Sequence, residues 1–157
     1  MKILMVCLGN ICRSPLAQGI LEKKISDHGL DWYVDSAGTG SWHVGEQPDK
    51  RSISVAKKNG LDISNQRARQ ISKADLKLFD IILTMDSSNY NDVLKLCSSE
   101  EERAKVKILL NYVHEGENKS VPDPYFSGGF DEVYRLLNEA MDCFIRKHLV
   151  EMTVACK

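Results

Sequence analysis

Apolar runs of strand length alternate with amphipathic segments along the chain. Four runs rich in aliphatic and β-branched residues indicate strands, at residues 2–6, 32–34, 79–85 and 106–110. Apolar residues at helical spacing indicate helices at residues 15–28, 48–59, 86–96 and 130–148, with a short helical turn at 73–78. This alternation predicts an α/β fold with three layers, in which helices cover both faces of a four-stranded parallel sheet.

Residues that favour helix ends mark the expected helix boundaries. Gly29 follows the first helix and suits its C-terminal cap. Helix starts are expected at Ser14 with Pro15 in the first helical position, at Pro48, at Ser72 and at Asp86. No repeat and no low-complexity linker separates these elements, so residues 1–157 are expected to form one domain.

The overall composition narrows the class of protein. The chain has 21 basic and 22 acidic side chains and a formal charge of −1, which excludes the broad basic field of a nucleic-acid-binding protein. The N-terminal apolar run is too short for a signal peptide or a membrane span, so we expect a cytoplasmic protein without membrane insertion. The five cysteines form no C-x-x-C pair and no zinc-binding cluster, so neither a disulfide framework nor a metal site is expected.

Residues 7–15, Cys-Leu-Gly-Asn-Ile-Cys-Arg-Ser-Pro, carry the main candidate chemistry between the first strand and the first helix. Gly9 and Asn10 tolerate left-handed backbone angles, and the loop leads into a helix N-terminus, where free N–H groups and the helix dipole attract an anion. The guanidinium of Arg13 suits two oxygens of a phosphate. The same positive field favours the thiolate of Cys7, so the loop predicts a phosphate site with a nucleophile.

A second stretch with the same Cys-x5-Arg spacing, residues 97–103, provides an internal comparison. It lacks glycine, follows a helical pattern and contains three glutamates that would repel phosphate, so we interpret this copy as chance. Ordinary core or surface positions are expected for Cys97, Cys143 and Cys156. Cys12 shares its loop with Cys7, and the two sulfurs could meet under oxidation and protect Cys7 from irreversible damage.

Attack of a thiolate on a phosphate ester also requires a proton for the leaving oxygen. Asp123 is the best-placed carboxyl group by local sequence, because it lies in a Pro-flanked, aromatic loop between the last strand and the last helix. Taken alone, the short Pro-flanked stretch around Asp123 is more simply interpreted as an Asp-Pro turn. The glycine- and hydroxyl-rich loop 35–45 follows a strand and is expected beside the anion loop, at the carboxyl edge of the sheet.

Together these motifs resemble the low-molecular-weight protein tyrosine phosphatases over essentially the whole chain. Six segments occur in the same order and with the same spacing as in that family. They are residues 7–15, Asp35-Ser36-Ala37-Gly38-Thr39, Trp42, Ala68-Arg69-Gln70-Ile71, Met85-Asp86 and Asp123-Pro124-Tyr125. The resemblance implies a flavodoxin-like fold of the phosphotyrosine phosphatase I type. It also implies hydrolysis of phosphotyrosine and small aryl phosphates through a phosphocysteine, with no cofactor and no metal.

The resemblance further implies individual catalytic roles. Cys7 is expected as the nucleophile, Arg13 as the phosphate clamp, and Asp123 as the acid that protonates the leaving phenol and then as the base for water. Ser14 would hydrogen-bond the sulfur. Tyrosine-phosphorylated proteins, and a tyrosine kinase among them, are the partners implied for a mostly monomeric enzyme with weak self-association.

The same resemblance implies supports and walls for the site. Loop support is expected from Asn10, Ser36 and Asp86. Substrate contacts are expected from Leu8, Gly9, Asn10, Ile11, Cys12, Ser14, Trp42, His43 and Tyr125. Aromatic walls would favour phosphotyrosine, since phosphoserine is too short to reach Cys7 while it keeps those contacts.

Two positions depart from the eukaryotic pattern. Many eukaryotic members carry a histidine near Gln66, which leaves one loop-supporting contact open, and a second tyrosine where this chain has Phe126. The phenylalanine removes a phosphorylation site and the regulation that it would bring.

Three alternatives remain at this point. An arsenate reductase would need two further cysteines close together, whereas Cys97 and Cys143 are far apart in sequence. Protein-arginine phosphatases of the family resemble this loop but carry Thr at the position of Ile11, so Ile11 favours the aromatic ester. A silent phosphotyrosine-binding module would be expected to lose Cys7 or Asp123, and this chain keeps both.

Overall fold

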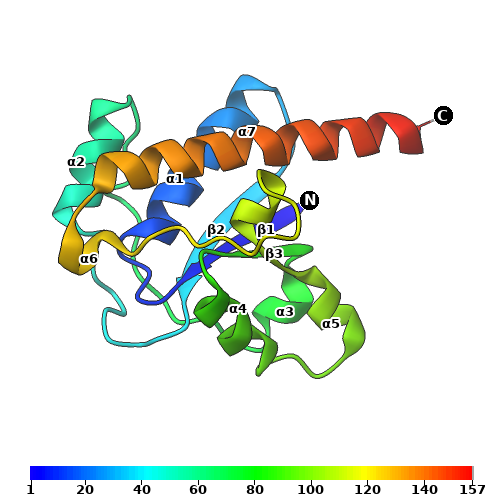
Figure 1. The fold of residues 1–157 in the computed structure, drawn as a ribbon, viewed down its shortest axis with the longest axis horizontal. Coiled ribbons are helices and arrows are strands. Elements are labelled where there is room, and N and C mark those ends of the chain that lie inside the picture. The colour runs from blue at the N-terminus through cyan, green and yellow to red at the C-terminus, as the bar shows by residue number, and fades with distance from the viewer. Residues whose placement is uncertain (157) are drawn as a thin grey trace.

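A four-stranded parallel sheet forms the middle layer of the computed structural model, which describes residues 1–156 (Figure 1). Its strands are β1 (Lys2–Cys7), β2 (Tyr33–Gly38), β3 (Ile81–Thr84) and β4 (Val106–Ile108), in the spatial order β2-β1-β3-β4. Each neighbouring pair is parallel. The predicted α/β sheet is confirmed, although β3 and β4 are shorter than the apolar runs that contain them.

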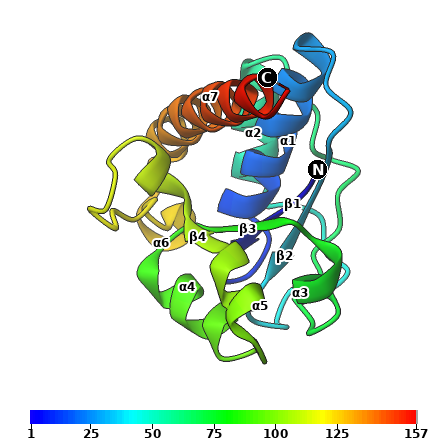
Figure 2. The same ribbon diagram turned by 90° about the vertical axis from the view of Figure 1, so that its right-hand side faces the viewer.

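Helices cover both faces of the sheet (Figures 1 and 2). One face carries α1 (Arg13–Asp27), α2 (Lys50–Lys58) and α7 (Phe130–Ala155), and the other carries α3 (Asp75–Leu78), α4 (Ser87–Leu94) and α5 (Glu100–Lys105). Side chains of β1 alternate between them, with Ile3 and Met5 in the core under α1 and α7, and Leu4 and Val6 in the core under α3 and α4. The central strand is therefore buried on both faces, as is usual in a parallel sheet.

The predicted start of the first helix is wrong by two positions, and the reason bears on function. α1 begins at Arg13 after Cys12 and has no side-chain cap, so Ser14 is not the cap and Pro15 is not the first helical residue. The Ser14 hydroxyl is instead turned toward the preceding loop, 3.0 Å from the sulfur of Cys7. A tertiary contact has replaced the local capping bond that serine usually makes at a helix start.

The other expected helix starts have mixed outcomes. Asp86 caps α4 as predicted, and its carboxylate accepts the backbone N–H of the third helical residue at 2.7 Å. The second helix is capped by Asp49 and does not begin at Pro48. Ser72 does not cap α3, because its hydroxyl donates to the carboxylate of Asp75.

Several short elements were not anticipated. They are α5, the 3₁₀ turn η1 (Leu109–Tyr112) and α6 (Pro124–Ser127), which occupies the stretch expected to be a rigid loop. The last helix continues past the predicted end at residue 148 to Ala155. No helix within residues 1–156 has the length and apolar character needed to cross a membrane.

The strand order places two connections next to each other at the carboxyl edge of the sheet. β1 pairs with β2 on one side and β3 on the other, so the loops after β1 and β3 lie at the switch point where such folds bind ligands. Gly38, at the end of β2, closely approaches the loop after β1. A Cβ on Gly38 would lie 2.8 Å from the carbonyl oxygen of Leu8, so this approach requires glycine.

Candidate active site

The anion loop, residues 8–12, closes around the sulfur of Cys7. The backbone N–H of Asn10 donates to the sulfur at 3.3 Å, and the Ser14 hydroxyl oxygen lies 3.0 Å from it. Asn10 has a left-handed backbone with φ of 57°, as predicted for this position. The other N–H groups of the loop donate to no group within residues 1–156, so they remain available to an anion held beside the sulfur.

A network of hydrogen bonds behind the loop holds this shape. The Asn10 amide donates to the Ser14 hydroxyl at 2.7 Å and to the Ser36 hydroxyl at 2.9 Å, and its oxygen accepts the backbone N–H of Arg69 at 3.0 Å. Ser36 in turn donates to the side-chain oxygen of Gln18 at 2.7 Å. Because this network is buried and connected, it stabilises one conformation of the loop.

Replacing Asn10 with Ala should lower kcat for an aryl phosphate by about 10- to 100-fold, because the loop loses three hydrogen bonds and the left-handed residue that positions its N–H groups. Asn118→Ala is a matched control. Asn118 also has a left-handed backbone, with φ of 53°, but it is exposed and does not line the cavity that contains Cys7. The control should retain wild-type kcat, and an equal loss in both variants would contradict the positioning role of Asn10.

The guanidinium of Arg13 is buried and anchored by one nitrogen. Nη1 donates to the Asp86 carboxylate at 2.7 Å and to the carbonyl oxygen of Val121 at 2.9 Å. Nε is buried without a hydrogen-bond partner in residues 1–156, and Nη2 makes only a long ion pair of 3.7 Å with Asp123. The Nε–Nη2 edge therefore has donors left for two oxygens of an anion.

Asp123 lines the same cavity as the anion loop. It caps α6, where one carboxylate oxygen accepts the backbone N–H of Tyr125 at 3.1 Å. The other oxygen is the one 3.7 Å from Arg13 Nη2, and the side chain is 41% exposed. The cap fixes one oxygen and leaves the other directed toward the arginine, in a position that solvent water can reach.

A cavity of about 270 Å³ joins these groups. Cys7, Arg13 and Asp123 all line it, and the floor is buried while the rim is open. Its remaining lining residues are Leu8, Gly9, Ile11, Cys12, Trp42, His43, Tyr125 and Phe126. A site with a thiol and an arginine at the bottom and aromatic rings at the mouth suits a phosphate carried on an aromatic group.

Comparison with known proteins identifies the family. The sequence matches the family described as low molecular weight phosphotyrosine protein phosphatase over residues 2–153. This chain belongs to that family. A member from Schizosaccharomyces pombe is 41% identical over 150 residues, which make up 92% of this chain and 95% of that protein. The resemblance seen in the sequence is confirmed.

Solved structures of phosphatases superimpose on nearly the whole chain. A protein tyrosine phosphatase from Entamoeba histolytica has a TM-score of 0.90 at 38% identity, with 97% of this chain and 99% of that chain covered. A Drosophila arginine phosphatase has a TM-score of 0.88 at 37% identity, with 94% and 98% covered. The predicted fold class is thus also confirmed by comparison.

The structure divides the predicted phosphatase site residues into two groups. Seven of the expected substrate contacts line the cavity, namely Leu8, Gly9, Ile11, Cys12, Trp42, His43 and Tyr125. Asn10 and Ser14, predicted as substrate contacts, do not line it, because their side chains are bonded to each other behind the loop. Of the predicted supports, Ser36 accepts a hydrogen bond from the Asn10 amide, and Asp86 accepts one from Arg13.

Several contributing residues escaped the sequence analysis. Gln18 and the backbone of Arg69 complete the network behind the loop, and the carbonyl of Val121 anchors Arg13. Phe126, noted only as a departure from the eukaryotic pattern, is 94% exposed at the cavity rim. The other departure, Gln66, donates to the carbonyl of the first-turn proline of α1 at 3.0 Å, so it still contacts the start of that helix.

The cysteines differ in their surroundings. Cys7 and Cys12 are both free and buried. Burial, with the negative charges of Asp49 and Cys7 nearby, raises the pKa of the Cys12 thiol to about 12, so Cys12 is a neutral thiol at physiological pH. Cys97 packs beside the α4 core and Cys143 is on α7, on opposite faces of the sheet, so the structure does not bring them together as a cysteine pair.

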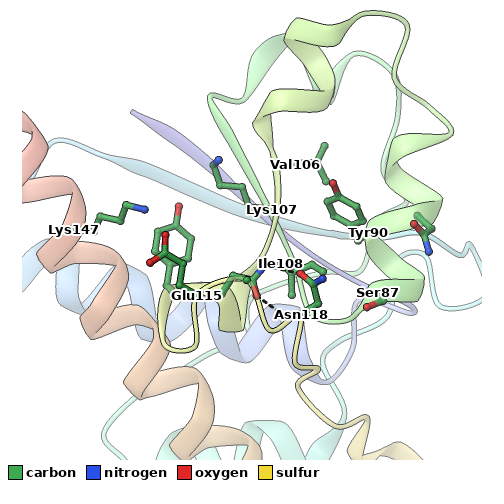
Figure 3. A pocket seen from close by; sticks show the side chains of 12 residues that line it. Ser87, Tyr90, Val106, Lys107, Ile108, Glu115, Asn118 and Lys147 are labelled. Atoms are coloured by element: carbon green, nitrogen blue, oxygen red, sulfur yellow. Dashed lines mark hydrogen bonds between the residues drawn. The ribbon is translucent and has the colours of Figure 1, made fainter.

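A larger hollow of about 520 Å³ lies away from Cys7, between α4, β4, η1 and α7 (Figure 3). Lys107, Lys147, Tyr90 and Glu115 border it, but its lining contains no cysteine, histidine or arginine. It therefore lacks the pair of a thiol and a guanidinium that the smaller cavity at Cys7 has, and that smaller cavity is the candidate active site. Within residues 1–156 no group of three or more histidine, cysteine, aspartate or glutamate side chains could hold a metal ion.

Proposed function

We propose that this protein hydrolyses phosphotyrosine in proteins, with Cys7, Arg13 and Asp123 as the catalytic residues. One observation carries the proposal. The sulfur of Cys7, the Nε–Nη2 edge of Arg13 and the carboxylate of Asp123 line a single cavity of about 270 Å³. Membership of the phosphatase family supports it independently.

The reaction proceeds in two steps. The Cys7 thiolate attacks phosphorus, the bond to the tyrosine oxygen breaks, and protonated Asp123 gives that oxygen its proton, so a phosphocysteine and free tyrosine result. Water then attacks phosphorus while the Asp123 carboxylate takes its proton, and the sulfur leaves as a thiolate. Loop N–H groups and Arg13 stabilise the phosphoryl oxygens in both steps, and the Ser14 hydroxyl stabilises the leaving sulfur.

The depth of the cavity supports an aromatic ester. Cys7 is buried at the floor, whereas Trp42 and Tyr125 stand exposed at the rim. A phosphotyrosine ring spans this depth with its faces against the walls, while the shorter side chain of phosphoserine would pull its peptide against the rim before phosphorus reached the sulfur.

Phosphoarginine is the second candidate substrate. The Drosophila structure that superimposes on this chain at 37% identity is an arginine phosphatase. In this chain the loop side chain at the relevant position is Ile11, which lines the cavity and offers no hydrogen-bond partner to a guanidino group. We therefore favour phosphotyrosine.

A panel of matched peptides tests the substrate class. Phosphotyrosine should be hydrolysed, phosphoserine should not, and phosphoarginine should react at least about tenfold more slowly, with EDTA present throughout. Ile11→Thr should shift the ratio of kcat/KM values toward phosphoarginine. Preference of the wild type for phosphoarginine would contradict this proposal. Phosphate release that stops in EDTA and returns when a divalent metal ion is added would contradict it as well.

The cellular setting is part of the same proposal. We place the protein in the cytoplasm, as a monomer with weak self-association that meets tyrosine-phosphorylated proteins, kinases among them. The near-zero formal charge of −1 supports protein substrates over nucleic acid.

A further inference from the structure

A second hollow, of about 390 Å³, adjoins the cavity that contains Cys7. The two share Leu8 and Trp42, so these two side chains form a ridge between them. Both side chains are more solvent-exposed than is usual for large apolar residues, with 41% of Leu8 and 70% of Trp42 exposed. A ridge of exposed apolar surface between two hollows is typical of a surface that a ligand covers.

The ridge has a defined position. The Trp42 ring lies directly against the backbone of Gly40, where an added Cβ would be 1.9 Å from the ring atom Cζ3. Leu8 is held by its backbone carbonyl, which accepts the N–H of Gly40 at 2.9 Å. The boundary between the hollows is therefore built by the fold, and a ligand meets it largely preformed.

The far wall of the second hollow is apolar and its edge is electrically balanced. Ile71 and Leu96 form the wall, from the loop after β2 and the turn after α4. Thr39 and Gln70 also line the hollow, where the Gln70 amide donates to the carbonyl oxygen of Thr39 at 3.1 Å. Asp92 and Lys95 lie at the edge and pair with each other at 3.6 Å. Since these two charges offset each other, the hollow favours a large apolar side chain over a charged one.

We propose that this hollow is a flank subsite, which binds a large apolar side chain, such as Leu, Met or Phe, two positions before or after the phosphotyrosine of a substrate protein. The inference rests on the proposed function, because it starts from phosphotyrosine in the cavity at Cys7. The peptide backbone then crosses the rim at the ridge. Side chains of an extended chain alternate between its two faces, so the side chain two positions from phosphotyrosine, about 6.6 Å along the chain, points to the same face and reaches over Leu8 and Trp42 into the subsite.

Peptides that differ only at the flanking residues two positions before and two positions after phosphotyrosine test the subsite. Leu, Ser, Glu or Lys is placed at one of these two positions, and kcat/KM is measured for each peptide and for p-nitrophenyl phosphate, which is too small to cross the ridge. For the wild type, kcat/KM of the peptide with Leu at one of these positions should exceed kcat/KM of the matching Ser peptide by about 3- to 10-fold, since the flank subsite buries part of an apolar side chain.

Leu96→Glu supplies a readout that a merely structural effect would not produce. It should abolish the preference for Leu and create one for Lys, with unchanged turnover of p-nitrophenyl phosphate. Leu78→Glu is the matched control, because Leu78 is an exposed leucine on α3 that lines neither hollow. Leu96→Ser should lose the preference for Leu without gaining one for Lys, which covers the case in which the charged variant fails to fold.

The outcomes separate this inference from the proposed function. Turnover of p-nitrophenyl phosphate and of phosphotyrosine peptides without a dependence on the flanking residue would overturn the flank subsite and leave the proposed function intact. A Leu preference that persists in both Leu96 variants would also overturn it. Absence of all turnover in the wild type would overturn the proposed function itself.

Discussion

Cys7→Ser should lower turnover of phosphotyrosine by at least about 10⁴-fold while the protein still binds inorganic phosphate. A serine hydroxyl is not ionised at neutral pH. Within residues 1–156 the side chain at this position bonds to the N–H of Asn10 and the hydroxyl of Ser14, and neither of these groups is a base. The free N–H groups of the loop and the Nε–Nη2 edge of Arg13 are unchanged by the substitution. Steady-state kinetics and calorimetric titration with phosphate would measure the two properties separately.

Cys97→Ser is the matched control for this prediction. Cys97 has the same spacing to an arginine as Cys7, but its sulfur donates to the carbonyl of Val93 beside the α4 core and faces no anion loop. This variant should retain wild-type turnover. Loss of phosphate binding together with turnover in Cys7→Ser would contradict the nucleophile assignment, because it would show that the cysteine supports the shape of the loop.

The contrast between the two Cys-x5-Arg stretches explains why the main site was predictable. Around residues 7–13 the strand, the glycine, the left-handed asparagine and the helix start are all local features that agree with one another, and the structure has the loop that they predict. The arginine at the other copy instead pairs with Glu100 on the surface of α5. Agreement among neighbouring residues carried more information than the spacing itself.

What escaped prediction depends on contacts between distant parts of the chain. Gln18 and Ser36 meet only because β2 lies beside α1, and Arg13 meets Val121 across 108 positions. No local pattern encodes such pairs. The error at the helix start has the same origin, since Ser14, expected to cap α1, instead contacts the sulfur of Cys7, a contact that only the family resemblance implied.

The helix errors have a different cause. α5 is a short charged helix, stabilised by the Ser99 hydroxyl that accepts the N–H of Glu102 and by surface ion pairs, so it shows almost no apolar periodicity. The last turns of α7 expose Val150, Met152 and Val154, so the amphipathic pattern fades before the helix ends. Hydrophobic periodicity detects a helix only where one of its faces is buried.

Asp123→Ala should reduce kcat/KM more for an ester whose leaving phenol has a higher pKa, because such a group leaves slowly without a proton. For phosphotyrosine, whose phenol has a pKa of about 10, we expect a loss of about 10²- to 10⁴-fold. For a dinitrophenyl phosphate, whose phenolate leaves readily without a proton, the loss should be less than about tenfold. Asp123 touches Arg13 only through the 3.7 Å ion pair, while Asp86 and Val121 anchor the clamp, so binding of inorganic phosphate should change little.

A matched control and a burst measurement make this prediction specific. Asp131→Asn removes another exposed carboxylate, one that pairs with Lys58 outside the cavity, and should leave every substrate unaffected. Because Asp123 is also the base for water in the second step, the alanine variant should release one equivalent of dinitrophenol rapidly and then hydrolyse its phosphocysteine slowly. Equal losses of kcat/KM for good and poor leaving groups would exclude Asp123 as the acid, since a group that only positions the phosphate acts on all esters alike.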